Sequence, residues 1–145
     1  TLSKAYGLAG ARVGWGLFPP AVAAQVRKMQ NSNQVTTSSL AMAVAAMADQ
    51  AYMRETVART AGIRDQFAHD LRSAGYHVPE SRTNFVLIGF SSAAAAEAAE
   101  KTLRGAGIIV RSLGGYGLRD CLRATVGPQE MMDRALHILI DMRGE

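Results

Sequence analysis

The hydrophobic period of the sequence changes at Gly75, and this change constrains the fold more than any other feature. From Tyr52 to Ala74, apolar and small residues recur at three- and four-residue spacing, which predicts one long amphipathic helix that Gly75 ends. The residues after Gly75 alternate between short apolar runs and helical patterns, in the order strand, helix, strand, strand, helix. This order predicts an α+β layer, a small sheet with helices on one face. The expected strands are residues 84–90, 108–113 and 121–127, and the expected helices are residues 91–107 and the segment after Pro128.

The first part of the chain has a less regular pattern. Residues 11–18 (ARVGWGLF) predict a strand, and residues 21–30 predict a helix with Pro20 in its first turn. Residues 40–49 are rich in alanine and methionine and carry few charges, which predicts a helix buried on most sides. Residues 1–51 are too few and too irregular for a domain of their own, so we expect them to be the end of something larger.

Composition excludes several classes of function. The net charge is +4, but the 16 lysines and arginines are scattered, which favours a solvated surface over a nucleic-acid face. No apolar stretch approaches the length of a membrane span, so we expect no transmembrane helix. The lone Cys121 excludes a disulfide framework and favours a reducing cytoplasm. His69, His77 and His137 lack metal-ligand spacing, so no metal site is expected.

Residues 3–12, SKAYGLAGAR, carry groups that suit one particular ligand. A lysine such as Lys4 forms a Schiff base with a carbonyl, Ser3 offers a hydroxyl, and Arg12 offers a planar fork that suits phosphate. Gly7 and Gly10 allow a ligand to approach the backbone closely. Together these groups suit a compound with an aldehyde and a phosphate, such as pyridoxal phosphate. On spacing alone, a glycine turn between two surface charges is the favoured explanation of the segment.

The longer segment TLSKAYGLAGARVGW resembles the lysine segment of class I/II aminotransferases of pyridoxal-phosphate fold type I. It is most similar to the histidinol-phosphate branch, whose signature S-K-x-[FY]-x-L-A-G-x-R-x-G is present at every fixed position. The resemblance implies an α/β fold: the end of the large cofactor-binding domain in residues 1–51, and a small α+β domain with the long interdomain helix in residues 52–145. It implies that Lys4 bonds the cofactor and later moves a proton, while Ser3 and Arg12 bind the cofactor phosphate.

The same resemblance assigns substrate contacts to the later strands. Arg123, in CLRATVG, matches the arginine that grips the substrate anion, and Arg111, in GIIVRSL, matches an arginine near substrate phosphate. A guanidinium fork at a strand end fixes an anion in one orientation. The glycine-rich residues 114–117 form either the pocket mouth or a plain turn. Asn84 and Tyr6 are interpreted as structural residues, and Cys121 as a small buried hydrophobe.

The family's chain is much longer than this one. The resemblance implies that the aspartate paired with the pyridine nitrogen, the stacking aromatic and a phosphate-binding helix N-terminus lie outside these residues. We therefore expect a fragment or a truncated product that is inactive alone. The expected activity is amino transfer between an amino acid or histidinol phosphate and a 2-oxo acid in a cytoplasmic homodimer, as in histidine biosynthesis. The alternatives are a threonine-phosphate decarboxylase, an aromatic aminotransferase or a non-catalytic small-domain module.

Overall fold

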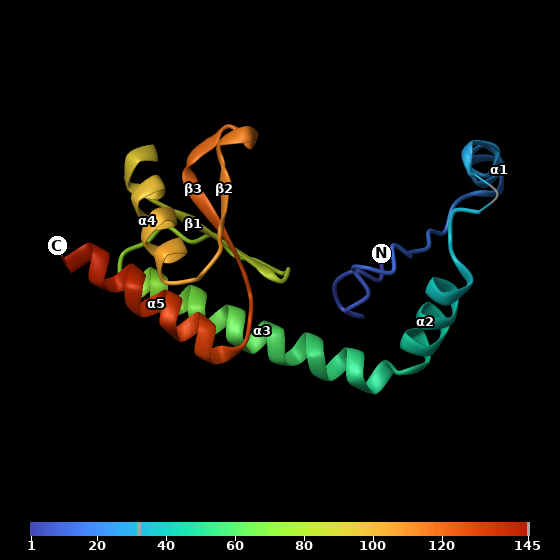
Figure 1. Cartoon of the computed structure of the whole chain (residues 1–145), viewed down its shortest axis with the longest axis horizontal. Coiled ribbons are helices and arrows are strands. Elements are labelled where there is room, and N and C mark those ends of the chain that lie inside the picture. The colour runs from blue at the N-terminus through green and yellow to red at the C-terminus, as the bar shows by residue number, and fades with distance from the viewer. Residues whose placement is uncertain (32, 145) are drawn as a thin grey trace. The chain divides into compact units, whose positions relative to one another are not determined.

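The computed structural model describes residues 1–31 and 33–144 of the chain. These residues form two compact units, Thr1–Val57 and Ala58–Glu145. Helix α3 (Gln50–Ser73) contains residues of both units, because the division falls within it. Each unit is described by itself below, and Figure 1 labels their helices and strands.

The second unit contains a three-stranded antiparallel sheet. Its strands are β1 (Phe85–Gly89), β2 (Arg111–Leu113) and β3 (Leu118–Thr125), in the order β1-β3-β2. A short 3₁₀ turn, η1 (Gly114–Tyr116), connects β2 to β3 at the tip of the hairpin (Figure 1). The strands and helices follow one another in the predicted order, which confirms the α+β layer.

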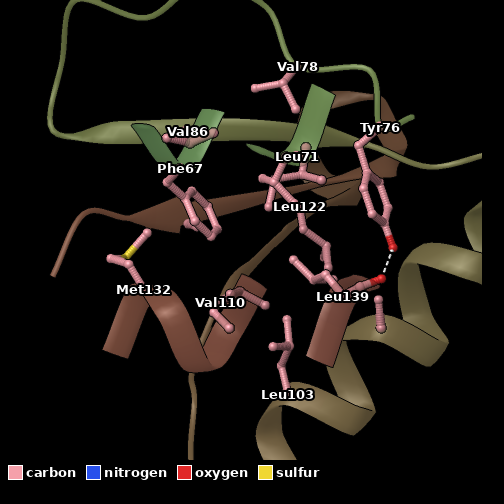
Figure 2. Packing of buried hydrophobic residues seen from close by; sticks show 14 of the residues in the cluster. Phe67, Leu71, Tyr76, Val78, Val86, Leu103, Val110, Leu122, Met132 and Leu139 are labelled. Carbon is pink, nitrogen blue, oxygen red and sulfur yellow. Dashed lines mark hydrogen bonds between the residues drawn. The ribbon is translucent and has the colours of Figure 1, made fainter. Parts of the chain in front are cut away.

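Alternation along the strands gives the sheet one buried face. Val86 and Ile88 of β1 and Leu122 and Ala124 of β3 are buried, whereas their neighbours in sequence point to the opposite face. The buried face packs against α3, α4 (Ala93–Gly105) and α5 (Gln129–Gly144), as Figure 2 shows. Each fully buried leucine in this core contributes about 2 kcal/mol through removal of apolar surface from water. The helical residues at the centre of the core are Phe67, Leu71, Leu103, Met132 and Leu139.

Local signals in the sequence determine where the helices of this unit begin and end. The side chain of Ser92 accepts a hydrogen bond of 3.1 Å from the amide of Ala95 and so caps α4, as predicted. Gly75 has φ of +85° and follows the end of α3, which is the usual role of glycine after a helix. The next residue, Tyr76, is buried and donates its hydroxyl to the carbonyl of Leu139 at 2.6 Å (Figure 2).

The strands of the hairpin differ in length from their predictions. The structure has β2 only from Arg111, because Ile108 and Val110 pack into the core without forming ladder pairs. By contrast, β3 begins at Leu118 rather than at Cys121. Strand ends depend on pairing with a neighbouring strand, and the apolar pattern does not specify that pairing.

The first unit contains α1 (Pro20–Met29) and α2 (Thr37–Ala48), with a small core of Leu2, Val13 and Ala43. Two predictions were wrong here. No strand forms over residues 11–18, because none of the described residues pairs with them as a neighbouring strand. Helix α2 is not buried on most sides, because the small core covers only some of its apolar side chains. Leu40, Met42, Val44 and Met47 are exposed.

Candidate active-site residues

The lysine segment folds into a closed loop. The amide of Leu2 donates to the carbonyl of Val13 at 3.1 Å, and the amide of Leu8 donates to the carbonyl of Leu2 at 3.0 Å. Both Leu2 and Val13 are buried in the small core, so the ends of the loop are held together. Ser3 follows one closing residue directly and Arg12 precedes the other. The fold therefore brings two predicted phosphate-binding residues, nine positions apart in sequence, to the same place.

Lys4 begins a tight turn within this loop. The amide of Gly7 donates to the carbonyl of Lys4 at 2.9 Å, and Gly7 has φ of +68°, which a side chain at this position would disfavour. Tyr6 packs against the small core and accepts a hydrogen bond of 3.2 Å from Nε2 of Gln50. The turn and the tyrosine fix the backbone of Lys4, while its side chain is exposed.

Ser3 and Arg12 line one open hollow of about 480 Å³. Arg12 has φ of +52°, the left-handed region that non-glycine residues rarely occupy, and its Nη1 donates to the carbonyl of Ala9 at 2.9 Å. The Ser3 hydroxyl accepts a hydrogen bond of 2.7 Å from the Thr1 hydroxyl. A hydroxyl and a guanidinium that face the same open hollow are suitable donors to a phosphate group.

The two predicted substrate arginines lie directly opposite each other in the sheet. Arg111 of β2 pairs in register with Arg123 of β3. Opposite residues in an antiparallel pair have their Cβ atoms about 5 Å apart and point to the same face. Like charges at such positions destabilise a sheet unless something compensates. The antiparallel register therefore brings together two arginines that are twelve positions apart in sequence.

Neutral groups hold both guanidinium groups. The Arg123 guanidinium lies 4.2 Å from the centre of the Phe85 ring, and its buried Nε has no hydrogen-bond partner among the described residues. The Arg111 guanidinium lies 5.7 Å from the centre of the Tyr116 ring, and its Nη2 donates to the Tyr116 hydroxyl at 3.3 Å. The ion pairs Arg64–Asp65 and Arg104–Glu100 include neither Arg111 nor Arg123. Neither arginine of the pair is therefore neutralised by a carboxylate in this part of the chain.

This arrangement suits a small anion with several oxygens. A guanidinium fork offers parallel N–H donors to phosphate or carboxylate, and the register places two such residues opposite each other. An anion bound by both Arg111 and Arg123 would relieve the repulsion between their like charges. The lysine segment belongs to the first compact unit and the arginine pair to the second.

Asn84 and Cys121 lie beside and within the strands of the sheet. The backbone carbonyl of Asn84 accepts a hydrogen bond of 2.9 Å from the amide of Val126, beside the first pair of the β1–β3 ladder. Cys121 is half-buried inside β3, so the prediction that it begins a buried strand was wrong. Burial raises the pKa of its thiol, and the neighbouring Asp120 carboxylate raises it further. The thiol is therefore protonated and unreactive at neutral pH.

Searches for a metal site and a membrane span give negative results within the described residues. No three His, Cys, Asp or Glu side chains in this part of the chain are placed to hold a metal ion. Among the helices of residues 1–31 and 33–144, none is both long enough and apolar enough to cross a membrane.

The sequence did not identify Phe85 and Tyr116 as partners of the arginines. Phe85 reaches Arg123 only through the register of β1 on β3, which local patterns do not specify. Tyr116 is the one large residue in the glycine-rich segment 114–117, whose sequence is compatible with a pocket mouth and with a plain turn. A large aromatic among glycines, five residues after an arginine, was the available signal.

Comparison with known proteins agrees with these features. The family model "Aminotransferase class I and II" matches residues 1–139. The chain is 39% identical over 137 residues to a histidinol-phosphate aminotransferase of Rhodospirillum centenum, and 41% identical over 136 residues to one of Jannaschia sp.. The matches cover 93% and 94% of this chain, and the chain spans 38% of the length of each relative.

A solved structure has a similar fold. The histidinol-phosphate aminotransferase of Sinorhizobium meliloti, crystallised with pyridoxal-5'-phosphate, is 34% identical and matches with a TM-score of 0.88. The match covers 99% of this chain and 40% of that one. These findings confirm the predicted fold class, part of a fold type I transferase, and the resemblance to the histidinol-phosphate branch. The chain therefore belongs to the class I and II aminotransferase family.

Proposed function

We propose that the protein is a pyridoxal-phosphate-dependent aminotransferase that moves an amino group between histidinol phosphate and a 2-oxo acid. The observation that carries the proposal is the register pair of Arg111 and Arg123, which lacks a neutralising carboxylate among the described residues. Its support from relatives is the 39% and 41% identity to histidinol-phosphate aminotransferases. The domain boundary near residue 51 also stays a proposal.

The residues of the lysine segment fit the cofactor. Ser3 and Arg12 line one hollow and would hold the cofactor phosphate, and the exposed Lys4 amine would bond its aldehyde. When bound, pyridoxal phosphate supplies a ring that accepts the electrons of a breaking bond at the substrate's α-carbon. Once the substrate's amine had displaced Lys4 from that aldehyde, the free Nζ of Lys4 would accept the α-proton and deliver it to the cofactor carbon that had carried the aldehyde.

The arginine pair explains how one site accepts two different substrates. Histidinol phosphate carries a phosphate, whereas the 2-oxo acid carries carboxylates. A guanidinium fork binds either anion through two parallel hydrogen bonds, so Arg111 and Arg123 would serve both half-reactions. Holding the anion fixes the orientation of the α-carbon, which lowers the entropic part of the barrier.

The proposal extends to assembly and location. We propose a homodimer in the cytoplasm, supported by the exposed apolar side chains of α2 and by the use of a single cysteine. We also propose that the 145 residues alone do not catalyse amino transfer. This is because they span 38% of the length of their relatives.

Cofactor attachment is the first test. The protein, in the full length that its gene encodes, is titrated with pyridoxal phosphate, reduced with borohydride and mapped by mass spectrometry. We expect one adduct, on Lys4, which Lys4→Ala abolishes and Lys28→Ala leaves intact because Lys28 is an exposed lysine on α1. An adduct spread over several lysines, or no adduct, would contradict the cofactor role.

Substrate choice is tested separately on the same protein. Histidinol phosphate, an aromatic amino acid and threonine phosphate are supplied as donors with 2-oxoglutarate, and both keto products and carbon dioxide are measured. We expect the highest kcat/KM for histidinol phosphate, without carbon dioxide release. Preference for an unphosphorylated aromatic donor, or decarboxylation of threonine phosphate, would replace the proposed substrate with one of those alternatives.

A further inference from the structure

We propose that Tyr116 is a positioning residue that holds the guanidinium of Arg111, the register partner of Arg123, in place with its charge intact, and so sets the affinity for phosphate-bearing substrates. This inference rests on the proposed function, because it concerns the same substrate anion. It goes further by assigning a role to the hairpin tip, residues 114–117.

The hairpin tip places Tyr116 close to Arg111 of β2. The turn η1 follows β2 directly and is closed by a hydrogen bond of 3.1 Å from the amide of Gly117 to the carbonyl of Gly114. Gly117 has φ of +80°, a conformation that suits glycine and that redirects the chain into β3. The result places the Tyr116 ring 5.7 Å from the Arg111 guanidinium, and its hydroxyl 3.3 Å from Nη2.

The chemistry of this contact suits an anion-binding arginine. A carboxylate would hold Arg111 more tightly, but it would also neutralise the charge that the substrate needs. An aromatic ring and a hydroxyl orient a guanidinium through its quadrupole and one hydrogen bond, and they leave its net charge unchanged. Arg123 is held in the same way, by the ring of Phe85 at 4.2 Å. Arg111 and Arg123, which are register partners in the sheet, therefore each contact an uncharged aromatic residue.

Exposure argues against a purely structural role for Tyr116. The residue is 67% exposed, so it buries little apolar surface and contributes little to folding through the hydrophobic effect. Arg111 is also exposed and belongs to an edge strand of three residues. A long side chain in such a place samples many rotamers, and ordering it before the substrate arrives lowers the entropic cost of binding.

The test compares Tyr116→Ala and Tyr116→Phe in the full-length, cofactor-loaded protein. For Tyr116→Ala we expect KM for histidinol phosphate to rise about five-fold with kcat changed less than about two-fold, since an exposed cation–π contact and one hydrogen bond are lost. Tyr116→Phe keeps the ring and should raise KM only about two-fold. Tyr52→Ala, an exposed tyrosine on α3, is the matched control and should leave both constants unchanged.

A second measurement separates this inference from the proposed function. Inorganic phosphate is titrated into the cofactor-loaded protein, and the melting temperature is followed without turnover. We expect phosphate to stabilise the parent protein and the Tyr52→Ala variant more than Tyr116→Ala. If the parent transfers no amino group but this difference remains, the proposed substrate fails and the positioning role holds. Equal phosphate stabilisation of all three proteins, or an unchanged KM in Tyr116→Ala, overturns the positioning role.

Discussion

Arg12 occupies a backbone conformation that its side chain disfavours. Its φ of +52° places a non-glycine residue in the left-handed region, at a cost of about 1 kcal/mol. The side chain compensates only in part, through one hydrogen bond of 2.9 Å to the carbonyl of Ala9. Strain of this kind persists where the surrounding structure fixes it, and it often accompanies a binding role. Here the closed loop of residues 2–13 fixes it, and the strained residue is the predicted phosphate ligand.

The first prediction separates stability from binding at this residue. Arg12→Gly relieves the backbone strain, so the free energy of unfolding should stay within about 1 kcal/mol of the parent value. The same change removes a guanidinium from the hollow, so the dissociation constant for pyridoxal phosphate should rise about ten-fold or more. Urea unfolding and cofactor titration measure the two effects. A large loss of stability with unchanged cofactor affinity would make Arg12 a structural residue.

Gly7 provides the opposite test in the same loop. Gly7→Ala adds a side chain at φ of +68° into open space, so strain alone should lower the free energy of unfolding by about 1 kcal/mol. Gly10→Ala is the matched control, because Gly10 also faces open space but has no positive φ. Its stability should change by less than about half as much. Equal effects of the two substitutions in urea unfolding would show that the turn at Lys4 does not require glycine.

Tyr76 gives a prediction for alkaline pH. Burial raises the pKa of its hydroxyl, and the positive charge of Arg143 opposes that shift only in part. A raised pKa in the folded state means that the contribution to stability is complete below about pH 10 and declines above it. Tyr76→Phe should lower stability by about 1 kcal/mol at pH 7, because the bond to Leu139 is lost. The free energy of unfolding of Tyr76→Phe should also fall less than that of the parent between pH 9 and about 11. Urea unfolding across this range measures both proteins. An equal fall would contradict the contribution of the Tyr76 hydroxyl to stability.

At the scale of elements, the hairpin of β2 and β3 determines the geometry of the arginine pair. The side chains of a strand alternate between faces, so a slip of one residue in β3 would turn Arg123 toward the core and Leu122 outward. The complete burial of Leu122 and Ala124 against the helices prevents that slip. The hydrophobic core therefore specifies the position of a charged residue on the opposite face.

A charge reversal in the hairpin tests whether repulsion between Arg111 and Arg123 lowers the stability of the protein. Arg111→Glu places a carboxylate opposite Arg123, so repulsion becomes attraction and stability should rise by about 0.5 kcal/mol. Arg111→Gln removes the repulsion without adding attraction, and its stability should lie between the two. Both variants should bind histidinol phosphate at least about ten-fold more weakly. Thermal unfolding and KM are the measurements, and a destabilised Arg111→Glu protein would contradict the repulsion.

Helices of this chain were easier to predict than strands, for a physical reason. Ser92 and Gly75 act on their own neighbours in sequence, so local patterns specify where α4 begins and where α3 ends. Strands need partners that are distant in sequence, and the predicted strand at residues 11–18 has none among the described residues. The geometry of the candidate site likewise depends on pairing between residues that are distant in sequence. Arg111 and Arg123 were identified individually by resemblance, but their direct opposition and their contacts with Tyr116 and Phe85 required the register.

At the scale of the whole molecule, the two compact units have unequal cores. The second unit buries residues from α3, α4, α5, β1 and β3 in one cluster. Among the described residues of the first unit, the buried apolar side chains are Leu2, Val13 and Ala43. Many of its large apolar side chains are exposed, Leu17 at 91% and Met29 at 87% among them. Because buried apolar surface must offset the entropy of ordering the chain, the two units should differ in stability.

This difference gives the last prediction, which also tests the boundary proposed near residue 51. A fragment of residues 50–145, which keeps α3 whole, should unfold cooperatively in urea because it contains the entire larger core. A fragment of residues 1–49 should show no cooperative transition, because three small buried side chains cannot offset its chain entropy. Trp15, the single tryptophan, reports on the first fragment by fluorescence, and circular dichroism reports on the second. Cooperative unfolding of residues 1–49, or its absence in residues 50–145, would place the boundary elsewhere.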